Sequence, residues 1–319
     1  MIKRKRGLRI PLLGLVVAVS LSLPLIGLSN AEAAPASKSK LSPNTMVSND
    51  GKVTAPTAPS SKAFSKQRDG ATTSSYKGTG KTLAKQPSIV TKKASVKNDL
   101  PFIGIKSIIG SDNRVRVTPA SSYPYSAIAH ISSDIGGCTG WFINANTVVT
   151  AGHCVYDTDT NKWATWATIT PGKDGSSAPY GTASARSFHS VVGWTTNEDT
   201  NYDYAAIKIN SNVGSSTGWF GFRWQSASLT GTAETISGYP GDKTYGTQWR
   251  HSDQIRQTYD RKLHYANDTF GGQSGSPVYQ SSYHSIAIHT NGVYGGNPYN
   301  RGTRITENVF NNLLYWRDL

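Results

Sequence analysis

Two short segments of the chain could together supply a nucleophile and a base. Residues 272–277, with the sequence GQSGSP, hold Ser274 between glycines at a predicted tight turn. Such a turn can present a hydroxyl to solvent and leave neighbouring backbone N–H groups free to bind an anion. Residues 150–154, with the sequence TAGHC, hold His153. Because a serine hydroxyl needs a base to remove its proton, and imidazole titrates near neutral pH, the pair predicts nucleophilic catalysis.

The imidazole would need a carboxylate to hold one tautomer and to stabilise the imidazolium. Asp203 directly precedes the apolar run at residues 204–207, so it should lie at the mouth of a buried strand, where a charge needs a partner. Asp199, in a more polar loop, is the second candidate. The chain has six other histidines, but only His153 follows a strand-like run and a small-residue turn that ends at a cysteine.

The elements that must position these groups are predicted to be β-strands. From residue 107 onward, strand-length runs of aromatic and β-branched residues alternate with Gly, Asn, Ser and Asp turns, which is typical of all-β barrels and sandwiches. The runs lie at residues 126–131, 141–143, 147–150, 204–209, 235–237 and 285–289. One helix is predicted at residues 308–316. The sequence has no nucleotide-binding glycine pattern and no metal-ligand spacing, so we expect no metal site.

The first third of the chain has the organisation of a secreted precursor. Residues 1–33 combine a basic start, an apolar stretch and the sequence AEA, which predicts a signal peptide cleaved after Ala33. A membrane anchor is the alternative, because the apolar stretch is almost long enough to span a bilayer, but Pro24 near its end favours cleavage. Residues 34–106 are rich in Ser, Thr, Lys, Pro and Ala, so we expect a disordered pro-segment or linker.

The formal net charge of +14 would by itself suggest a nucleic-acid or membrane partner. Residues 1–106 carry all of this excess, whereas residues 107–319 hold 15 basic and 15 acidic groups. We therefore expect no nucleic-acid partner, no membrane association after processing, and an extracellular location.

Cys138 and Cys154 are the two cysteines of the chain, and in a secreted protein they are expected to pair. The disulfide would close a loop of 16 residues and contribute about 3 kcal/mol. A zinc site is the alternative, but two cysteines with one adjacent histidine make a poor ligand set.

Motifs spread over residues 107–319 resemble one peptidase family at two levels. TAGHC (150–154), NYDYAAIK (201–208) and GQSGSP (272–277), in the order His, Asp, Ser, resemble the chymotrypsin-fold serine peptidases. At the narrower level, five segments resemble the secreted glutamyl endopeptidases of bacilli. They are SIIGSD (107–112), CTGWF (138–142), DTNYDYAAIKIN (199–210), SGYPGDK (237–243) and AIHTNG (287–292). The resemblance implies two antiparallel six-stranded barrels, assigned here to residues 107–215 and 216–319, with the site in the cleft between them and a C-terminal helix.

The resemblance also implies roles for individual residues. Ser274 would be the nucleophile of a serine endopeptidase that works through an acyl-enzyme, with His153 as base and then acid and Asp203 as the orienting carboxylate. The N–H groups of Gly272 and Ser274 would form the oxyanion hole. Protein and peptide substrates, a monomer and no required cofactor are expected, while the sequence does not show whether a structural calcium ion is bound. A catalytically silent binding module on the same fold is the alternative from another class.

A preference for glutamate, and less for aspartate, before the cut is expected from His289, Thr269 and Ser107. His289 lies on the strand expected to wall the pocket, Thr269 supplies a hydroxyl, and resemblance to the family places the freed α-amine of Ser107 near the substrate carboxylate. Asp268 supports the alternative, trypsin-like cleavage after Lys or Arg, because it lies six residues before Ser274. A structural strand histidine is the other interpretation of His289.

The distribution of glutamate agrees with a glutamate-cutting enzyme. Residues 107–319 contain twelve Asp but only three Glu, and residues 34–106 contain no Glu. A scarcity of Glu would protect such an enzyme from cleaving its own chain. Such an enzyme should not cut the bond between Lys106 and Ser107. We therefore expect a separate basic-specific or broad protease as the activating partner.

Two features depart from the wider family. Gln273 stands where animal chymotrypsin-like enzymes carry an Asp that pairs with the freed N-terminus, so release of Ser107 must act differently here. Gly241 and Gly272 stand where some relatives carry a second cysteine pair, which leaves the pocket walls without that crosslink.

Overall fold

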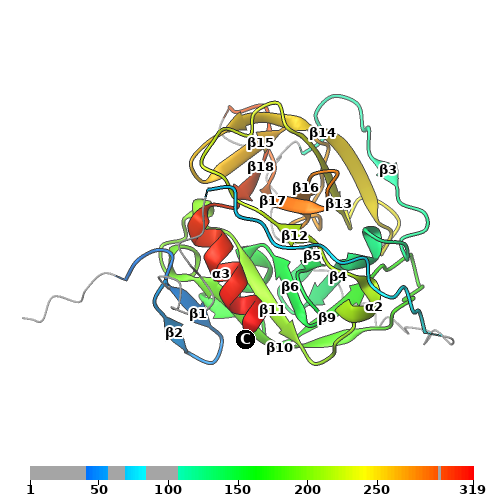
Figure 1. Ribbon diagram of the computed structural model, residues 1–319, viewed down its shortest axis with the longest axis horizontal. Coiled ribbons are helices and arrows are strands. Elements are labelled where there is room, and N and C mark those ends of the chain that lie inside the picture. The colour runs from blue at the N-terminus through cyan, green and yellow to red at the C-terminus, as the bar shows by residue number, and fades with distance from the viewer. Residues whose placement is uncertain (1–40, 57–68, 84–106, 294–295) are drawn as a thin grey trace, which may run out of the picture. The chain divides into compact units, whose positions relative to one another are not determined.

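The computed structural model describes residues 41–56, 69–83, 107–293 and 296–319, and most of its strands form two closed antiparallel barrels (Figure 1). In the first barrel the strand order is β11-β6-β5-β4-β9-β10, and pairing of β10 with β11 closes the ring. Its strands are β4 (Ile128–Ser133), β5 (Gly136–Phe142), β6 (Thr147–Thr150), β9 (Ala167–Pro171), β10 (Ala183–Val191) and β11 (Ala205–Ile209). β6 and β11 are buried along their whole length, and in the sequence they appear as runs that are apolar except for Thr147, Thr150 and Lys208.

The second barrel also has six strands, in the order β17-β16-β13-β14-β15-β18, and pairing of β17 with β18 closes it. Its strands are β13 (Ala233–Gly238), β14 (Trp249–Thr258), β15 (Lys262–Tyr265), β16 (Pro277–Tyr279), β17 (His284–Asn291) and β18 (Asn300–Arg304). Two short strands extend this sheet, β12 (Gly221–Phe222) beside β17 and β3 (Val115–Arg116) beside β14, while β7 (Tyr156–Asp157) and β8 (Lys162–Trp163) form a separate hairpin. The predicted two-barrel fold is confirmed.

The predicted C-terminal helix is α3 (Glu307–Asp318), in red in Figure 1. The hydroxyl of Thr306 accepts a hydrogen bond from the N–H of Val309 and so caps the helix. Trp316 is fully buried, and its ring lies 5.7 Å from that of Tyr204, which directly precedes β11 in the first barrel. The remaining helices are short: α1 (Val192–Thr195), α2 (Gly214–Thr217) and the 3-10 turns η1 (Tyr125–Ala127), η2 (Gly152–Cys154) and η3 (Thr200–Tyr202).

Both ends of residues 107–319 reach the barrel that is remote in sequence. Strand β3, near the start, pairs with β14 of the second barrel, and α3, at the end, packs on the first. The division at 215/216 accordingly remains a prediction about domains, although the two closed sheets lie on either side of it.

The expectation of disorder is wrong for two parts of the pro-segment. Residues 41–56 contain the hairpin β1 (Met46–Ser48) and β2 (Val53–Thr54), in which β1 pairs with β10. Residues 69–83 run along the body of the protein and form isolated bridges to Arg223 and Trp219. The segment has too little apolar surface to fold alone, but it can order by adding to surfaces that the barrels provide.

Several sequence predictions lie outside the described residues. These are the signal peptide at residues 1–33, its cleavage after Ala33, and Lys106 on one side of the expected activation bond. Within the part of the chain that the structure describes, no helix is long and apolar enough to cross a membrane.

Candidate active site

His153 and Asp203 form a pair at the edge of the first barrel. His153 lies in η2, directly after β6, and Asp203 lies between η3 and β11, which pairs with β6. The Nδ1 atom of His153 is 2.8 Å from Oδ2 of Asp203, and the backbone N–H of His153 donates to Oδ1 at 3.0 Å. The Asp203 side chain is fully buried, whereas 33% of the His153 side chain is exposed. The buried carboxylate therefore fixes the ring while part of the ring remains accessible.

The two partners shift each other's titration. Burial disfavours the charged imidazolium, but the adjacent Asp203 carboxylate outweighs it and raises the pKa of His153 above its usual value. Burial likewise disfavours ionised Asp203, but the charge and hydrogen bonds of His153 hold the pKa of that carboxyl below its usual value. The arrangement favours a negatively charged Asp203 beside a histidine that readily takes up a proton.

Asp199, the second candidate carboxylate, has a local structural role. Its side chain accepts a hydrogen bond from the N–H of Asn201 at 2.9 Å and caps η3. It thus helps to shape the turn that ends at Asp203, and the interpretation of Asp199 as the partner of His153 is wrong.

A buried lysine supports the same turn from the second barrel. The hydroxyl of Thr303 donates to the backbone oxygen of Asp203 at 2.9 Å and accepts from Nζ of Lys262 at 3.1 Å. Lys262 also donates to Thr290 and Asn291, at 3.1 and 3.3 Å, and burial lowers its pKa to about 8. Lys262 and Thr303 therefore tie the Asp203 turn to β17 and β18.

Ser274 lies in the loop before β16, next to the His153 segment. Its backbone oxygen accepts a hydrogen bond from the N–H of Thr139 at 2.8 Å and lies 3.7 Å from Sγ of Cys154, the neighbour of His153. Within the described residues, the backbone N–H groups of Gly272 and Ser274 donate to no protein acceptor. This leaves two donors available on the loop that carries Ser274.

The loop requires glycine on both sides of the serine. Gly272 has φ of +97° and Gly275 has φ of +88°, conformations that side chains rarely adopt. A Cβ atom at Gly275 would also lie 2.1 Å from the backbone oxygen of Thr139. Between them, Gln273 is buried, and its Oε1 accepts from the N–H of Phe270 at 3.0 Å. Gln273 thus closes the turn internally, where the wider family carries an ion-pairing carboxylate.

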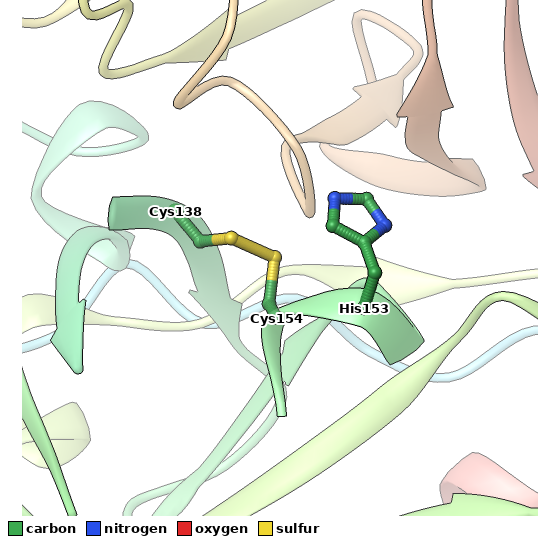
Figure 2. A group of neighbouring side chains, drawn as sticks. All are labelled: Cys138, His153 and Cys154. Carbon is green, nitrogen blue, oxygen red and sulfur yellow. A yellow bond between two sulfur atoms is a disulfide. The ribbon is translucent and has the colours of Figure 1, made fainter. Parts of the chain in front are cut away.

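The predicted disulfide between Cys138 and Cys154 is confirmed, with an S–S distance of 2.02 Å. It joins β5 to the turn that carries His153 (Figure 2). Among the described residues, Cys138, His153 and Cys154 form the one His/Cys/Asp/Glu group close enough to hold an ion. Because both sulfurs are bonded to each other, neither is the thiolate that a zinc site uses, so this donor set does not fit a zinc ion.

His289 is on β17, as expected for a pocket wall, and is 3% exposed. Its Nδ1 lies 2.8 Å from the hydroxyl of Tyr265. Burial, together with the positive charge of His153 and Lys262, lowers the pKa of His289 to about 3, so the ring is neutral near pH 7. Burial also keeps the pKa of Tyr265 well above its usual value, which preserves the phenol as a donor.

Ser107 and Thr269 meet at the second barrel. The backbone oxygen of Ser107 accepts from the N–H of Thr269 at 3.0 Å and from Nδ2 of Asn300 at 2.7 Å. Asn300 lies opposite Tyr265 in the β15–β18 ladder. Ser107 and Thr269, two of the three predicted specificity residues, are therefore in direct contact. Asn300 links them to β15, whose Tyr265 is the hydrogen-bond partner of His289.

Asp268 does not have the environment that trypsin-like binding of Lys or Arg would need. Its side chain is buried, and its two oxygens accept the backbone N–H groups of Ile109 at 2.7 Å and Asn113 at 2.8 Å. The carboxylate is occupied by the chain segment that follows Ser107, so the alternative based on Asp268 is wrong.

Sequence reasoning missed Lys262, Thr303, Tyr265 and Asn300. Lys262 follows Asp260 and Arg261, so the sequence around it resembles an exposed polar turn. The partners of these residues lie on other strands, and the local sequence gives no signal for them.

Comparisons with known proteins agree with this geometry. The family profile described as Trypsin matches residues 113–314. A glutamyl endopeptidase of Bacillus licheniformis is 46% identical, over 98% of this chain and 97% of that protein. A protein of Bacillus subtilis described as an extracellular metalloprotease is 42% identical over 95% and 93%.

A solved Glu endopeptidase structure is similar as well, with a TM-score of 0.64 and 32% identity over 66% of this chain and all of that chain. The chain therefore belongs to the trypsin family of serine endopeptidases, among the relatives of the bacterial glutamyl endopeptidases.

Proposed function

We propose that the protein hydrolyses peptide bonds after glutamate, and less readily after aspartate, with Ser274 as nucleophile. The observation that carries this proposal is the His153–Asp203 pair beside a serine loop with two available N–H groups. As Ser274 Oγ attacks the substrate carbonyl, its proton passes to Nε2 of His153, while Asp203 holds the Nδ1 proton. His153 then gives the proton to the leaving amine, and water, activated by the same histidine, hydrolyses the acyl-enzyme.

The N–H groups of Gly272 and Ser274 are proposed to bind the negative oxygen of the tetrahedral intermediate. Since they donate to no acceptor within the described residues, binding the oxyanion would cost them no existing hydrogen bond. The left-handed backbone at Gly272 orients its N–H, and the Gln273 side chain holds the turn that carries both donors. No cofactor is required for this chemistry.

His289 is proposed to bind the substrate carboxylate as a neutral donor. When the Tyr265 hydroxyl donates to Nδ1 of His289, the tautomer places the remaining proton on Nε2. A neutral donor costs less to bury than an imidazolium. The Thr269 hydroxyl and the α-amine of Ser107 are proposed to complete the site. The hydrogen bond from the N–H of Thr269 to the backbone oxygen of Ser107 keeps these two residues side by side.

Maturation is proposed to proceed by a separate protease that cuts between Lys106 and Ser107 after secretion. In the uncut chain Ile109 and Asn113 already donate to Asp268, and the Ser107 carbonyl accepts from Thr269, so cleavage would free an α-amine on a segment that is largely in place. This supports an activation that does not use an ion pair at Gln273. We further propose that the secreted product is a monomer that acts on proteins and peptides.

A peptide panel with Glu, Asp, Arg or Phe before the cut tests the proposed specificity. We expect the highest kcat/KM for Glu, then Asp, and a preference for Arg would contradict the proposal. A fluorophosphonate should label the wild type but not Ser274→Ala, whose kcat should fall at least about 10⁴-fold. A protein that binds peptides but neither labels nor cleaves would instead be the silent binding module.

A further inference from the structure

The described parts of the pro-segment contact surfaces that the proposed chemistry does not use. Strand β1 lies along β10, with Met46 opposite Val191 and Ser48 opposite His189. Beyond the strand, the N–H groups of Val192 and Gly193 donate to the pro-segment at 2.9 and 2.8 Å. In Figure 1 the blue β1–β2 hairpin lies beside α3 and β10. The pro-segment thus adds a strand to β10 beyond Ala183 and Ser184, the residues that pair with β9.

Side chains, and not only backbone hydrogen bonds, hold residues 41–56 against the first barrel and α3. Met46 is 2% exposed and belongs to a hydrophobic core cluster that joins residues of the first barrel to residues of α3. Asn312 of α3 is 1% exposed, and its Nδ2 donates to the backbone oxygen of Asn44 at 3.1 Å and to the hydroxyl of Tyr204 at 2.8 Å. Loss of residues 41–56 would remove an acceptor from a buried amide and leave an unfilled apolar site.

Residues 69–83, the second described stretch of the pro-segment, approach the rest of the chain most closely where Gly78 meets Gly218. Tyr76 and Trp219 exchange backbone hydrogen bonds of 2.9 and 2.8 Å, and their rings lie 4.3 Å apart. A Cβ atom on Gly78 would lie 2.4 Å from the backbone nitrogen of Gly218, and one on Gly218 would lie 2.4 Å from the backbone oxygen of Tyr76. This close approach tolerates no side chain on either partner.

The proposed catalytic groups are outside this contact. Within the described residues, no hydrogen bond joins residues 41–56 or 69–83 to His153, Asp203 or Ser274. The segment also lacks the residue that the proposed specificity prefers, because residues 34–106 contain no Glu, and in the two described stretches only Asp50 and Asp69 are sites of the slower cleavage after aspartate.

We propose that the pro-segment, through residues 41–56 and 69–83, stays bound after the bond between Lys106 and Ser107 is cut. It then acts as a non-covalent strand partner of β10 and α3 that stabilises the first barrel and leaves the peptidase site open to substrate. Its survival beside the active enzyme rests on the proposed glutamate specificity, but its binding does not.

The test uses the full chain with residues 101–106 replaced by the recognition sequence of a site-specific protease that accepts Ser after the cut. In a Ser274→Ala background, the chain is cut and passed over a sizing column at micromolar concentration. We expect the N-terminal fragment to co-elute with residues 107–319. Elution of the wild-type fragment on its own would overturn the proposal, whatever the peptide panel shows.

Two glycine variants make a matched pair for the contact. Gly78→Ala and Gly80→Ala both place a side chain at positive φ, +78° and +68°, but a Cβ atom on Gly80 has no neighbour within 4 Å. Gly78→Ala should speed release of the fragment at least about tenfold relative to Gly80→Ala, and equal release rates would contradict the assigned contact. Melting curves recorded before the cut verify that both variants fold.

A last measurement tests whether the bound N-terminal fragment inhibits the peptidase. With Ser274 intact, the cut complex should cleave a short peptide at the rate shown by protein from which the fragment has been removed. Activity that appears only after removal of the fragment would contradict an open site.

Discussion

Two buried carboxylates, Asp203 and Asp268, have similar surroundings but different uses. Each is essentially inaccessible, each accepts backbone N–H groups, and each lies near Nδ1 of a histidine, His153 at 2.8 Å and His251 at 3.4 Å. Distance and burial alone would make both pairs candidates for catalysis.

The direction of the hydrogen bond at Nδ1 separates the two pairs. At His251, Nδ1 accepts the backbone N–H of Asp268 at 2.8 Å, so that nitrogen carries no proton to share with the carboxylate. At His153, Nδ1 faces the Asp203 carboxylate, which has no proton to donate, so Nδ1 is the donor. The first geometry anchors a chain segment, whereas the second leaves Nε2 free to act as a base.

Asp203→Asn should have the largest effect. The amide can still accept the N–H of His153 but no longer favours a proton on Nδ1, so the wrong tautomer should lower kcat about 10⁴-fold. Steady-state kinetics on a Glu-containing peptide would measure this loss, with a thermal melt to verify folding. A folded variant that retained a tenth of wild-type kcat would show that Asp203 is not the orienting group.

Asp268→Asn should mainly affect stability. Its NH₂ group would face one of two buried backbone donors, from Ile109 and Asn113, and the free energy of unfolding should fall by about 1–3 kcal/mol. Urea unfolding measures the change, with the partly exposed Asp174→Asn as a control that should be nearly neutral. A drop in kcat as large as that of Asp203→Asn, without loss of stability, would contradict the anchoring role.

The pH profile provides a third distinction between the two carboxylates. His153 must be neutral to act as a base, and Asp203 raises its pKa, so kcat/KM should fall as pH drops through a value above about 6.5. Without the Asp203 charge, the residual activity of Asp203→Asn should persist to a lower pH than that of the wild type. Asp268→Asn should leave the midpoint where the wild type has it, and an equal shift in both variants would remove the distinction.

The three segments of the proposed triad stand out in the sequence because each carries a local signal. His153 follows the apolar run of β6, Asp203 precedes that of β11, and Ser274 lies between obligatory glycines. Six barrel strands were not predicted: β9, β10, β14, β15, β16 and β18. Polar residues interrupt both faces of β10 and β14, and the other four strands have five residues or fewer. Local pattern therefore reports on strands with distinct apolar runs and overlooks those that are largely polar or short.

The errors involved partners that are distant in sequence. Position relative to Ser274 suggested a pocket role for Asp268, but it could not show that the N–H groups of Ile109 and Asn113 would reach that carboxylate. Composition predicted that the pro-segment could not fold alone, but it gave no sign that β10 and α3 would order part of it. In both cases the deciding contact joins residues more than a hundred positions apart.

Lys262→Met should give the smallest effect. It extends the comparison to the buried lysine that is linked to the backbone of Asp203 through Thr303. Burial and the Lys262 charge both lower the pKa of His153, against the effect of Asp203, so removing the ammonium should move the acid limb of kcat/KM to higher pH, by less than Asp203→Asn moves it to lower pH. Lys208→Met is the matched control. Lys208 is also a buried lysine with its pKa lowered to about 8, but its Nζ binds Thr147 and the C-terminal end of α3. An equal shift in both variants would mean that loss of any buried charge perturbs the site. A shift in Lys262→Met alone would place that lysine in the electrostatic surroundings of the pair.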